Sequence, residues 1–156
     1  MQKKFSKFFY YLVCFVFFII CNFYASNQII SYIRSGHAVS DNRYFGLNYV
    51  QNTGAAFSIL QNSTELLIIL SVAALLGIFI YIIKHLKSIS MKSLFCLALL
   101  SAGIAGNMHE RIVYGFVRDY FQLKFIDFPV FNVADIFINV GVFLLIIIIL
   151  LKKTRL

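Results

Sequence analysis

Four long apolar runs dominate the hydropathy pattern of the chain, and polar segments separate them. The runs cover residues 8–32, 66–83, 93–112 and 133–151. Each run is close to or above the roughly 20 residues that a helix needs to cross a bilayer. The pattern predicts an all-α membrane protein with four transmembrane helices, organised as one membrane-embedded domain over residues 1–156.

The third run carries small residues along its length. They are Ser101, Gly103 and Gly106. In lipid, small side chains let the backbones of neighbouring helices approach closely. We therefore expect the third helix to pack tightly against its neighbours.

Two longer connecting segments lie on the same side of this arrangement. In residues 33–65, the β-prone stretch from Tyr44 to Val50 precedes a turn signal at Asn52-Thr-Gly54, and a second apolar stretch follows. We expect a small β-rich sheet or hairpin there, between the first and second helices. Residues 113–132 are aromatic-rich and contain the only proline, Pro129, a composition typical of a segment at the membrane interface.

Charge is distributed unevenly between the connecting segments. The N-terminus, the loop after the second run and the C-terminus carry nine Lys and Arg residues and no acid. The other side carries five basic residues and all six acids. Because cytoplasmic loops collect Lys and Arg, we expect both termini to be cytoplasmic and the two longer segments to be outside.

Composition excludes several classes of function. The chain is 61% apolar and 13% charged, whereas soluble proteins average roughly 45–50% and 25%. A net charge of +8 is scattered between the apolar runs and forms no dense basic stripe, so we expect no nucleic-acid partner. His37, His85 and His109 have no metal-ligand spacing, and we expect neither a metal nor a cofactor.

Polar residues concentrate where the third run ends and the fourth begins. Four of the six acids lie between Gly106 and Asp135. Asp119 comes just after the third predicted helix, and Asp135 lies in the first turn of the fourth. Ionisable groups at such depths are functional candidates. Two neighbouring carboxyl groups share one proton, so that one activates a water and the other polarises a carbonyl. The pair predicts a membrane-embedded aspartyl hydrolase.

Each of these residues also has a purely structural interpretation. Asn132 and Asp135 match a helix N-cap with an acid in the first turn, and Asp119 beside Arg118 matches a solvated interfacial charge. Asn107 and Arg111 are four apart and share a helix face. Asn107 needs hydrogen-bond partners in lipid. Arg111 can instead extend to the interface or pair with the neighbouring Glu110.

Four motifs occur in a specific order along the chain. They are Asn52-Thr-Gly-Ala-Ala-Phe-Ser58, Gly106-Asn107-x-x-Glu110-Arg111, Gly115-x-Val117-x-Asp119-Tyr120 and Phe128-Pro-x-Phe-Asn132-x-Ala134-Asp135. In this order they resemble the lipoprotein signal peptidase (signal peptidase II) family. The resemblance extends over the whole chain, including its length, its four spans and the outer segment after the first helix.

The resemblance implies an intramembrane aspartyl protease that cleaves the signal peptide from diacylglyceryl-modified prolipoproteins, just before the lipidated cysteine. Asp119 and Asp135 would match the catalytic dyad, and Asn52, Gly54, Asn107, Arg111 and Asn132 would match the substrate-lining and dyad-supporting positions. It also implies a monomer in the bacterial inner membrane, with its site near the periplasmic face, in contact with lipid and inhibited by globomycin.

The chain departs from the family pattern at two places. Glu110 stands where the family usually has Asp. The Asp-Gln-x-x-Lys pattern of the family's first helix is matched here only by Asn22-Phe-Tyr-Ala-Ser26, so neither Asn22 nor Ser26 is predicted as a site residue.

Two other functions compete with the protease. One is a small transporter or proton-coupled protein, which would need polar residues through to the inner face. The inner halves of the second and fourth runs are almost purely apolar, which argues against such a path. The other is a scaffold whose capped helices carry no chemistry.

Overall fold

The computed structural model describes residues 2–36, 43–55 and 59–153. Its elements, in chain order, are α1 (Gln2–Arg34), β1 (Phe45–Asn52), α2 (Thr64–His85), α3 (Met91–Tyr114), β2 (Val117–Leu123) and α4 (Val133–Lys153). The four helices are long and apolar enough to cross a membrane, as predicted. They extend beyond the predicted runs because polar residues at the ends of each run continue the helix.

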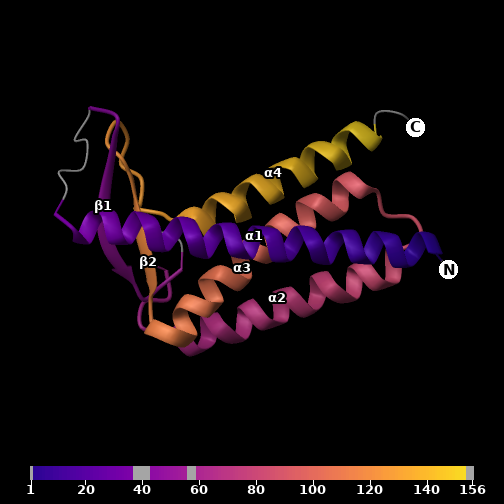
Figure 1. The fold of residues 1–156 in the computed structure, drawn as a ribbon, viewed down its shortest axis with the longest axis horizontal. Coiled ribbons are helices and arrows are strands. Elements are labelled where there is room, and N and C mark those ends of the chain that lie inside the picture. Colours follow the sequence, from indigo (N-terminus) through magenta and orange to yellow (C-terminus); the bar gives the residue numbers. More distant parts are fainter. Residues whose placement is uncertain (1, 37–42, 56–58, 154–156) are drawn as a thin grey trace.

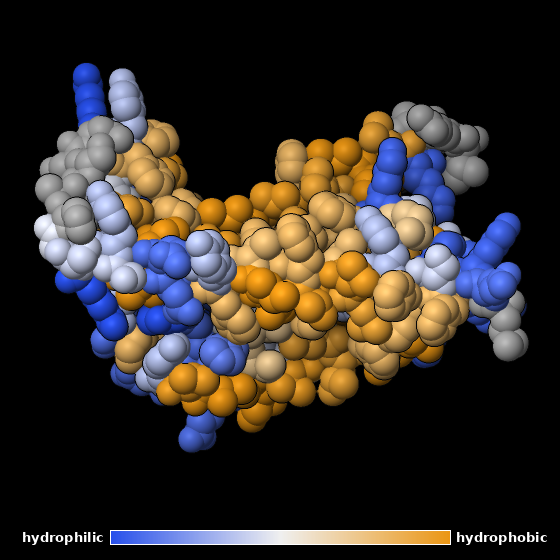
Figure 2. All heavy atoms as spheres, in the orientation of Figure 1, coloured by the Kyte–Doolittle hydropathy of each residue, from blue (hydrophilic) through white to orange (hydrophobic). Residues whose placement is uncertain are grey.

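The helices form an elongated bundle with two distinct ends (Figure 1). Strands β1 and β2 lie at one end, here called the sheet end. Both chain termini and the link between α2 and α3 lie at the other, the terminal end. A broad apolar surface lies between two ends where hydrophilic residues gather (Figure 2). This distribution fits a protein that spans a bilayer along the long axis of the bundle.

Helix α3 is the centre of the bundle and packs against all three other helices. Half of its spanning segment is buried, compared with 11% in each of the others. A side chain at Gly103 would collide with the backbone oxygen of Ala134, and one at Gly141 would lie 3.0 Å from the backbone oxygen of Cys96. The expected close approach between helices is thus confirmed, and it holds the start of α4 against α3.

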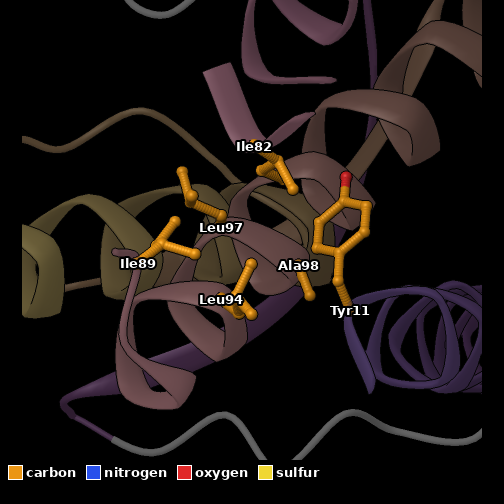
Figure 3. Close-up of a cluster of buried hydrophobic side chains, with 6 residues drawn as sticks. All are labelled: Tyr11, Ile82, Ile89, Leu94, Leu97 and Ala98. Atoms are coloured by element: carbon orange, nitrogen blue, oxygen red, sulfur yellow. The ribbon is translucent and has the colours of Figure 1, made fainter. Parts of the chain in front are cut away.

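A cluster of apolar side chains joins α1, α2 and α3 (Figure 3). Its buried members are Tyr11, Ile82, Ile89, Leu94, Leu97 and Ala98. Polar contacts accompany it. The Tyr11 hydroxyl donates to Ser101 Oγ at 3.0 Å, and Lys7 Nζ donates to the Ile89 backbone oxygen at 2.7 Å. Apolar packing thus forms most of the contact between these helices, and a few hydrogen bonds lie at its edge.

The small sheet is confirmed, but its strands come from both outer segments. β1 pairs antiparallel with β2, placing Val50 opposite Asp119 and Asn52 opposite Val117. Helix α3 is capped by Gly115, whose φ of 81° turns the chain towards β2. Strand β1 thus has its described partner in the second outer segment. Residues 56–58, part of the predicted second apolar stretch, lie outside the described residues.

Candidate active site

Asp119 lies in β2 and is held from two sides by amide groups. Its side chain is only 2% exposed. Asn52 Nδ2 donates to Asp119 Oδ2 at 3.0 Å, and Asn132 Nδ2 donates to Asp119 Oδ1 at 2.7 Å. The interpretation of Asp119 as a solvated interfacial charge is therefore wrong, because the strand turns this carboxyl group into the protein.

Asp135 lies in the first turn of α4 and combines two roles. Asn132 Oδ1 accepts from the Asp135 backbone N–H at 3.0 Å, while Asp135 Oδ2 accepts from the Asn132 backbone N–H at 3.0 Å. This reciprocal pair is a capping box, so the structural interpretation of these residues is confirmed. The other oxygen, Oδ1, accepts from Asn107 Nδ2 at 2.8 Å. The cap fixes the carboxyl group without using both of its oxygens.

Asn132 connects the two acids. Its side-chain amide donates to Asp119, and its backbone N–H donates to Asp135. The same amide lies 3.1 Å from Asn107 Oδ1, which ties the pair to α3. Strand β2, helix α3 and the start of α4 thus meet at a single asparagine, and both carboxyl groups lie beside it.

Burial controls the protonation of this pair. Burial first, and the negative charge of Asp135 second, raise the pKa of Asp119 from 3.8 to about 7. This pKa is lowered by the hydrogen bonds from Asn52 and Asn132 and by the positive charge of Arg111, but these effects are smaller. Two nearby carboxylates in a poorly hydrated site resist double ionisation, and the raised pKa of Asp119 reflects this resistance.

Arg111 holds the turn after β1 against α3. Its Nη2 donates to the Gly54 backbone oxygen at 2.7 Å, and Nη1 donates to the Asn107 backbone oxygen at 3.4 Å. The turn is completed by Asn52 Oδ1, which accepts from the Gly54 N–H at 2.9 Å. The alternatives of interfacial extension and pairing with Glu110 are wrong. The buried Arg111 Nε makes no hydrogen bond within the part of the chain that the structure describes.

Glu110 binds Arg118 instead, a contact that sequence reasoning missed. The carboxylate forms an ion pair with the Arg118 guanidinium and accepts from the Arg118 backbone N–H at 2.9 Å. The guanidinium also lies 4.4 Å from the centre of the Tyr114 ring. Glu110 precedes the Gly115 turn and Arg118 follows it, so the turn brings them together. The sequence did carry a signal for this ion pair, because two opposite charges, Glu110 and Arg118, stand on either side of Gly115.

Ser26 and Tyr120 were also missed as residues near the site. Both are buried, and their hydroxyl oxygens lie 2.8 Å apart. Tyr120 OH additionally accepts from the Val133 N–H at 3.2 Å. In the sequence, Tyr120 ends the third motif but no role was predicted for it. Ser26 ends the altered first-helix pattern and was not predicted as a site residue. The available signal was therefore their place in these two patterns.

The structure brings all seven predicted site residues into one hydrogen-bonded group. They are Asn52, Gly54, Asn107, Arg111, Asp119, Asn132 and Asp135. Among the described residues, no three His, Cys, Asp or Glu side chains are grouped so as to hold a metal ion. Fold and site together define a four-helix membrane protein with two carboxyl groups joined through asparagine at the sheet end.

Comparison with known proteins gives the family. The family model for "Signal peptidase (SPase) II" matches residues 12–151. The chain belongs to the signal peptidase II family, and it is a multi-pass membrane peptidase.

Individual relatives agree with this assignment. The chain is 45% identical over 104 residues to a lipoprotein signal peptidase of Streptococcus thermophilus, covering 67% of each chain. It is 33% identical over 138 residues to that of Fusobacterium nucleatum, covering 88% of this chain and 84% of the relative. A solved bacterial membrane enzyme superposes with a TM-score of 0.74 at 27% identity, over 92% of this chain and 88% of that one.

Proposed function

We propose that this protein is a lipoprotein signal peptidase that works as an intramembrane aspartyl endopeptidase. It removes the signal peptide from diacylglyceryl-modified prolipoproteins and cleaves just before the lipidated cysteine. The observation that carries the proposal is the attachment of both Asp119 and Asp135 to Asn132. Family membership supplies the substrate class, and this attachment supplies a carboxyl pair able to activate water.

The proposed reaction uses one water and the proton retained by the carboxyl pair. The ionised carboxyl takes a proton from the water, and the water oxygen attacks the scissile carbonyl carbon. The protonated carboxyl gives its proton to the carbonyl oxygen, producing a neutral tetrahedral diol. When the carbon–nitrogen bond breaks, the leaving nitrogen takes a proton from one carboxyl, and the diol returns a proton to the other. The pair ends as it began, with one proton between two acids.

The surrounding residues orient this chemistry in our proposal. Asn52, Asn107 and Asn132 hold the two carboxyl groups with directional bonds to named oxygens. Arg111 and Gly54 hold the turn that ends β1 above the pair. Such a fixed polar frame stabilises charge developing in the transition state without reorganising during the reaction. No cofactor takes part in this scheme.

The proposed setting is the bacterial inner membrane, with both termini cytoplasmic and the site near the periplasmic face. The apolar surface of the bundle would contact membrane lipid, from which a lipid-anchored substrate arrives laterally (Figure 2). Asp135 is only partly buried, which leaves the pair accessible to water and substrate from the sheet end. The enzyme acts as a monomer on prolipoprotein, without nucleic acid, and globomycin inhibits it by blocking the carboxyl pair.

The test is cleavage of a synthetic diacylglyceryl-modified prolipoprotein by the purified protein in detergent. Asp119→Asn and Asp135→Asn should each lower kcat by about 1,000-fold or more, because neither variant can share a proton between two acids. Asp127→Asn is the matched control, since Asp127 is exposed in the same outer segment.

Three outcomes would contradict the proposal. They are substantial cleavage by either dyad variant, an equal loss in the Asp127 control, and equal cleavage of a prolipoprotein that lacks the diacylglyceryl group. Globomycin should protect the substrate from the wild-type enzyme.

A further inference from the structure

Tyr120 is the largest fully buried side chain among the described residues. It follows Asp119 in β2, and successive side chains of a strand point to opposite faces. Its ring therefore lies on the opposite face of the strand from the Asp119 side chain, and its hydroxyl reaches two other elements. Tyr120 OH lies 2.8 Å from Ser26 Oγ in α1 and accepts from the Val133 N–H of α4 at 3.2 Å.

The contact with Val133 completes the start of α4. The first N–H groups of a helix have no partner within the helix. The Asp135 N–H is bound by Asn132, and the Val133 N–H is bound by Tyr120. Adjacent residues of β2 thus serve the same helix turn, since Asp119 binds the Asn132 side chain and Tyr120 binds the next backbone amide.

Ser26 connects this arrangement to a third element. The serine is 5% exposed and belongs to α1, which packs against α3 beside the site. A tyrosine oxygen that accepts from a backbone amide can still donate its own proton, and Ser26 Oγ is within reach. The two hydroxyl groups therefore link α1, β2 and α4 through one buried point.

We propose that Tyr120 and Ser26 are positioning residues that set the separation of Asp119 and Asp135. The inference rests on the proposed function, because it assigns these residues to the alignment of the catalytic pair. Neither residue contacts the reacting atoms. Tyr120 acts by fixing the first turn of α4 relative to β2, and Ser26 acts by fixing Tyr120 relative to α1.

The decisive variant is Tyr120→Phe, which keeps the ring and removes the hydroxyl. A small misplacement of catalytic groups lowers turnover by up to about 100-fold, so we expect kcat to fall about 10- to 100-fold with KM changed less than about threefold. Tyr11→Phe is the matched control. Tyr11 is also buried and its hydroxyl also binds a serine, Ser101, but this contact lies beside the apolar cluster. The kcat of Tyr11→Phe should stay within about threefold of the wild-type value.

Ser26→Ala tests the second half of the proposal. We expect a smaller fall in kcat than in Tyr120→Phe, because the hydroxyl can still bind the Val133 N–H. If Ser26 acts only through its contact with Tyr120, the double variant should lose no more activity than Tyr120→Phe alone. Two independent sites would instead give losses that add.

Amide hydrogen exchange provides a readout that does not need turnover. The Val133 amide, in the first turn of α4, should exchange faster in Tyr120→Phe than in the wild type. Its exchange rate should not change in Tyr11→Phe. The inference is overturned if Tyr120→Phe keeps the kcat of the wild type, or if Tyr11→Phe loses as much kcat as Tyr120→Phe. Either result leaves the proposed function intact. If the wild type itself fails to cleave prolipoprotein, the proposed function falls. Unchanged exchange at Val133 overturns the inference in either case.

Discussion

The two ends of the bundle bury different kinds of side chain. At the terminal end, α1, α2 and α3 meet through an apolar cluster, and the hydrogen bonds beside it come from Tyr11 and Lys7 of α1. At the sheet end, buried polar groups from several elements bind one another around Asp119 and Asn132. Apolar packing is non-directional, so it places helices, whereas hydrogen bonds place individual oxygen and nitrogen atoms. The proposed active site lies at the end where contacts of the second kind gather.

This contrast also explains how the sheet end tolerates its buried charges. An unpaired polar group in a poorly hydrated interior is costly. Glu110 and Arg118 are both below 10% exposed and pair with each other, while each carboxyl of the Asp119–Asp135 pair receives amide donors. Removing one member of such a group leaves its partner buried and unsatisfied. The sheet end should therefore be more sensitive to single polar substitutions than the terminal end.

The largest expected effect is on activity at Asn132. Asn132→Ala removes the amide that binds Asp119 and the oxygen that caps α4, so kcat should fall by about 100- to 1,000-fold. Ser101→Ala, which removes a buried polar group beside the apolar cluster, should keep kcat within about threefold. Cleavage rates of the two purified variants check this. Equal losses would show that the two ends do not differ in the way described.

The next effect is on stability at Glu110. Glu110→Ala leaves the Arg118 guanidinium buried without its carboxylate, which should lower the free energy of unfolding by about 3–5 kcal/mol. Glu65→Ala removes an exposed acid from the first turn of α2 and should cost less than about 1 kcal/mol. Unfolding in mixed micelles measures both values. If Glu110→Ala lowers the free energy of unfolding by less than Glu65→Ala does, the ion pair of Glu110 with Arg118 does not stabilise the fold.

A smaller loss of stability is expected in the apolar cluster. Leu94 is fully buried there, and Leu94→Ala should lower the free energy of unfolding by about 2 kcal/mol, near the low end for such changes because lipid is as apolar as leucine. The kcat of the folded fraction should not change, since packing loss at the terminal end does not move the carboxyl pair. A fall in kcat beyond about threefold would show coupling between the ends.

The smallest effect, measured per pH unit, is a dependence of stability on pH. The pKa of Asp119 is about 7 in the folded protein, against an ordinary value of 3.8 for a solvated aspartate, so the folded protein binds more protons between these values. Stability should therefore decrease as pH rises from about 4 to 7, with a slope of at most about 1.4 kcal/mol per pH unit from this group. The slope should be smaller in Asp119→Asn. Thermal unfolding at several pH values measures it, and the same slope in the variant would exclude Asp119 as its source.

Family resemblance and local pattern selected seven residues that the structure joins in one hydrogen-bonded group. Asp119, Asp135 and Asn132 stood out because polar residues are rare in so apolar a chain. Three structural interpretations were wrong, namely the pairing of Glu110 with Arg111, the extension of Arg111 to the interface and the solvation of Asp119. All three depend on which groups meet when the two outer segments fold back over α3. The capping role of Asn132 was correct and coexists with its place in the site.

The sequence by itself determined the helices, because the length and spacing of apolar residues fix which segments can enter a bilayer. It also determined the start of α4, since a capping box needs only residues three apart. Tertiary structure alone decided the pairing of β1 with β2 and the contact of Tyr120 with Ser26. These contacts join segments that become neighbours only when the helices pack. No local pattern encodes them, because hydrogen-bond partners are selected by position in space.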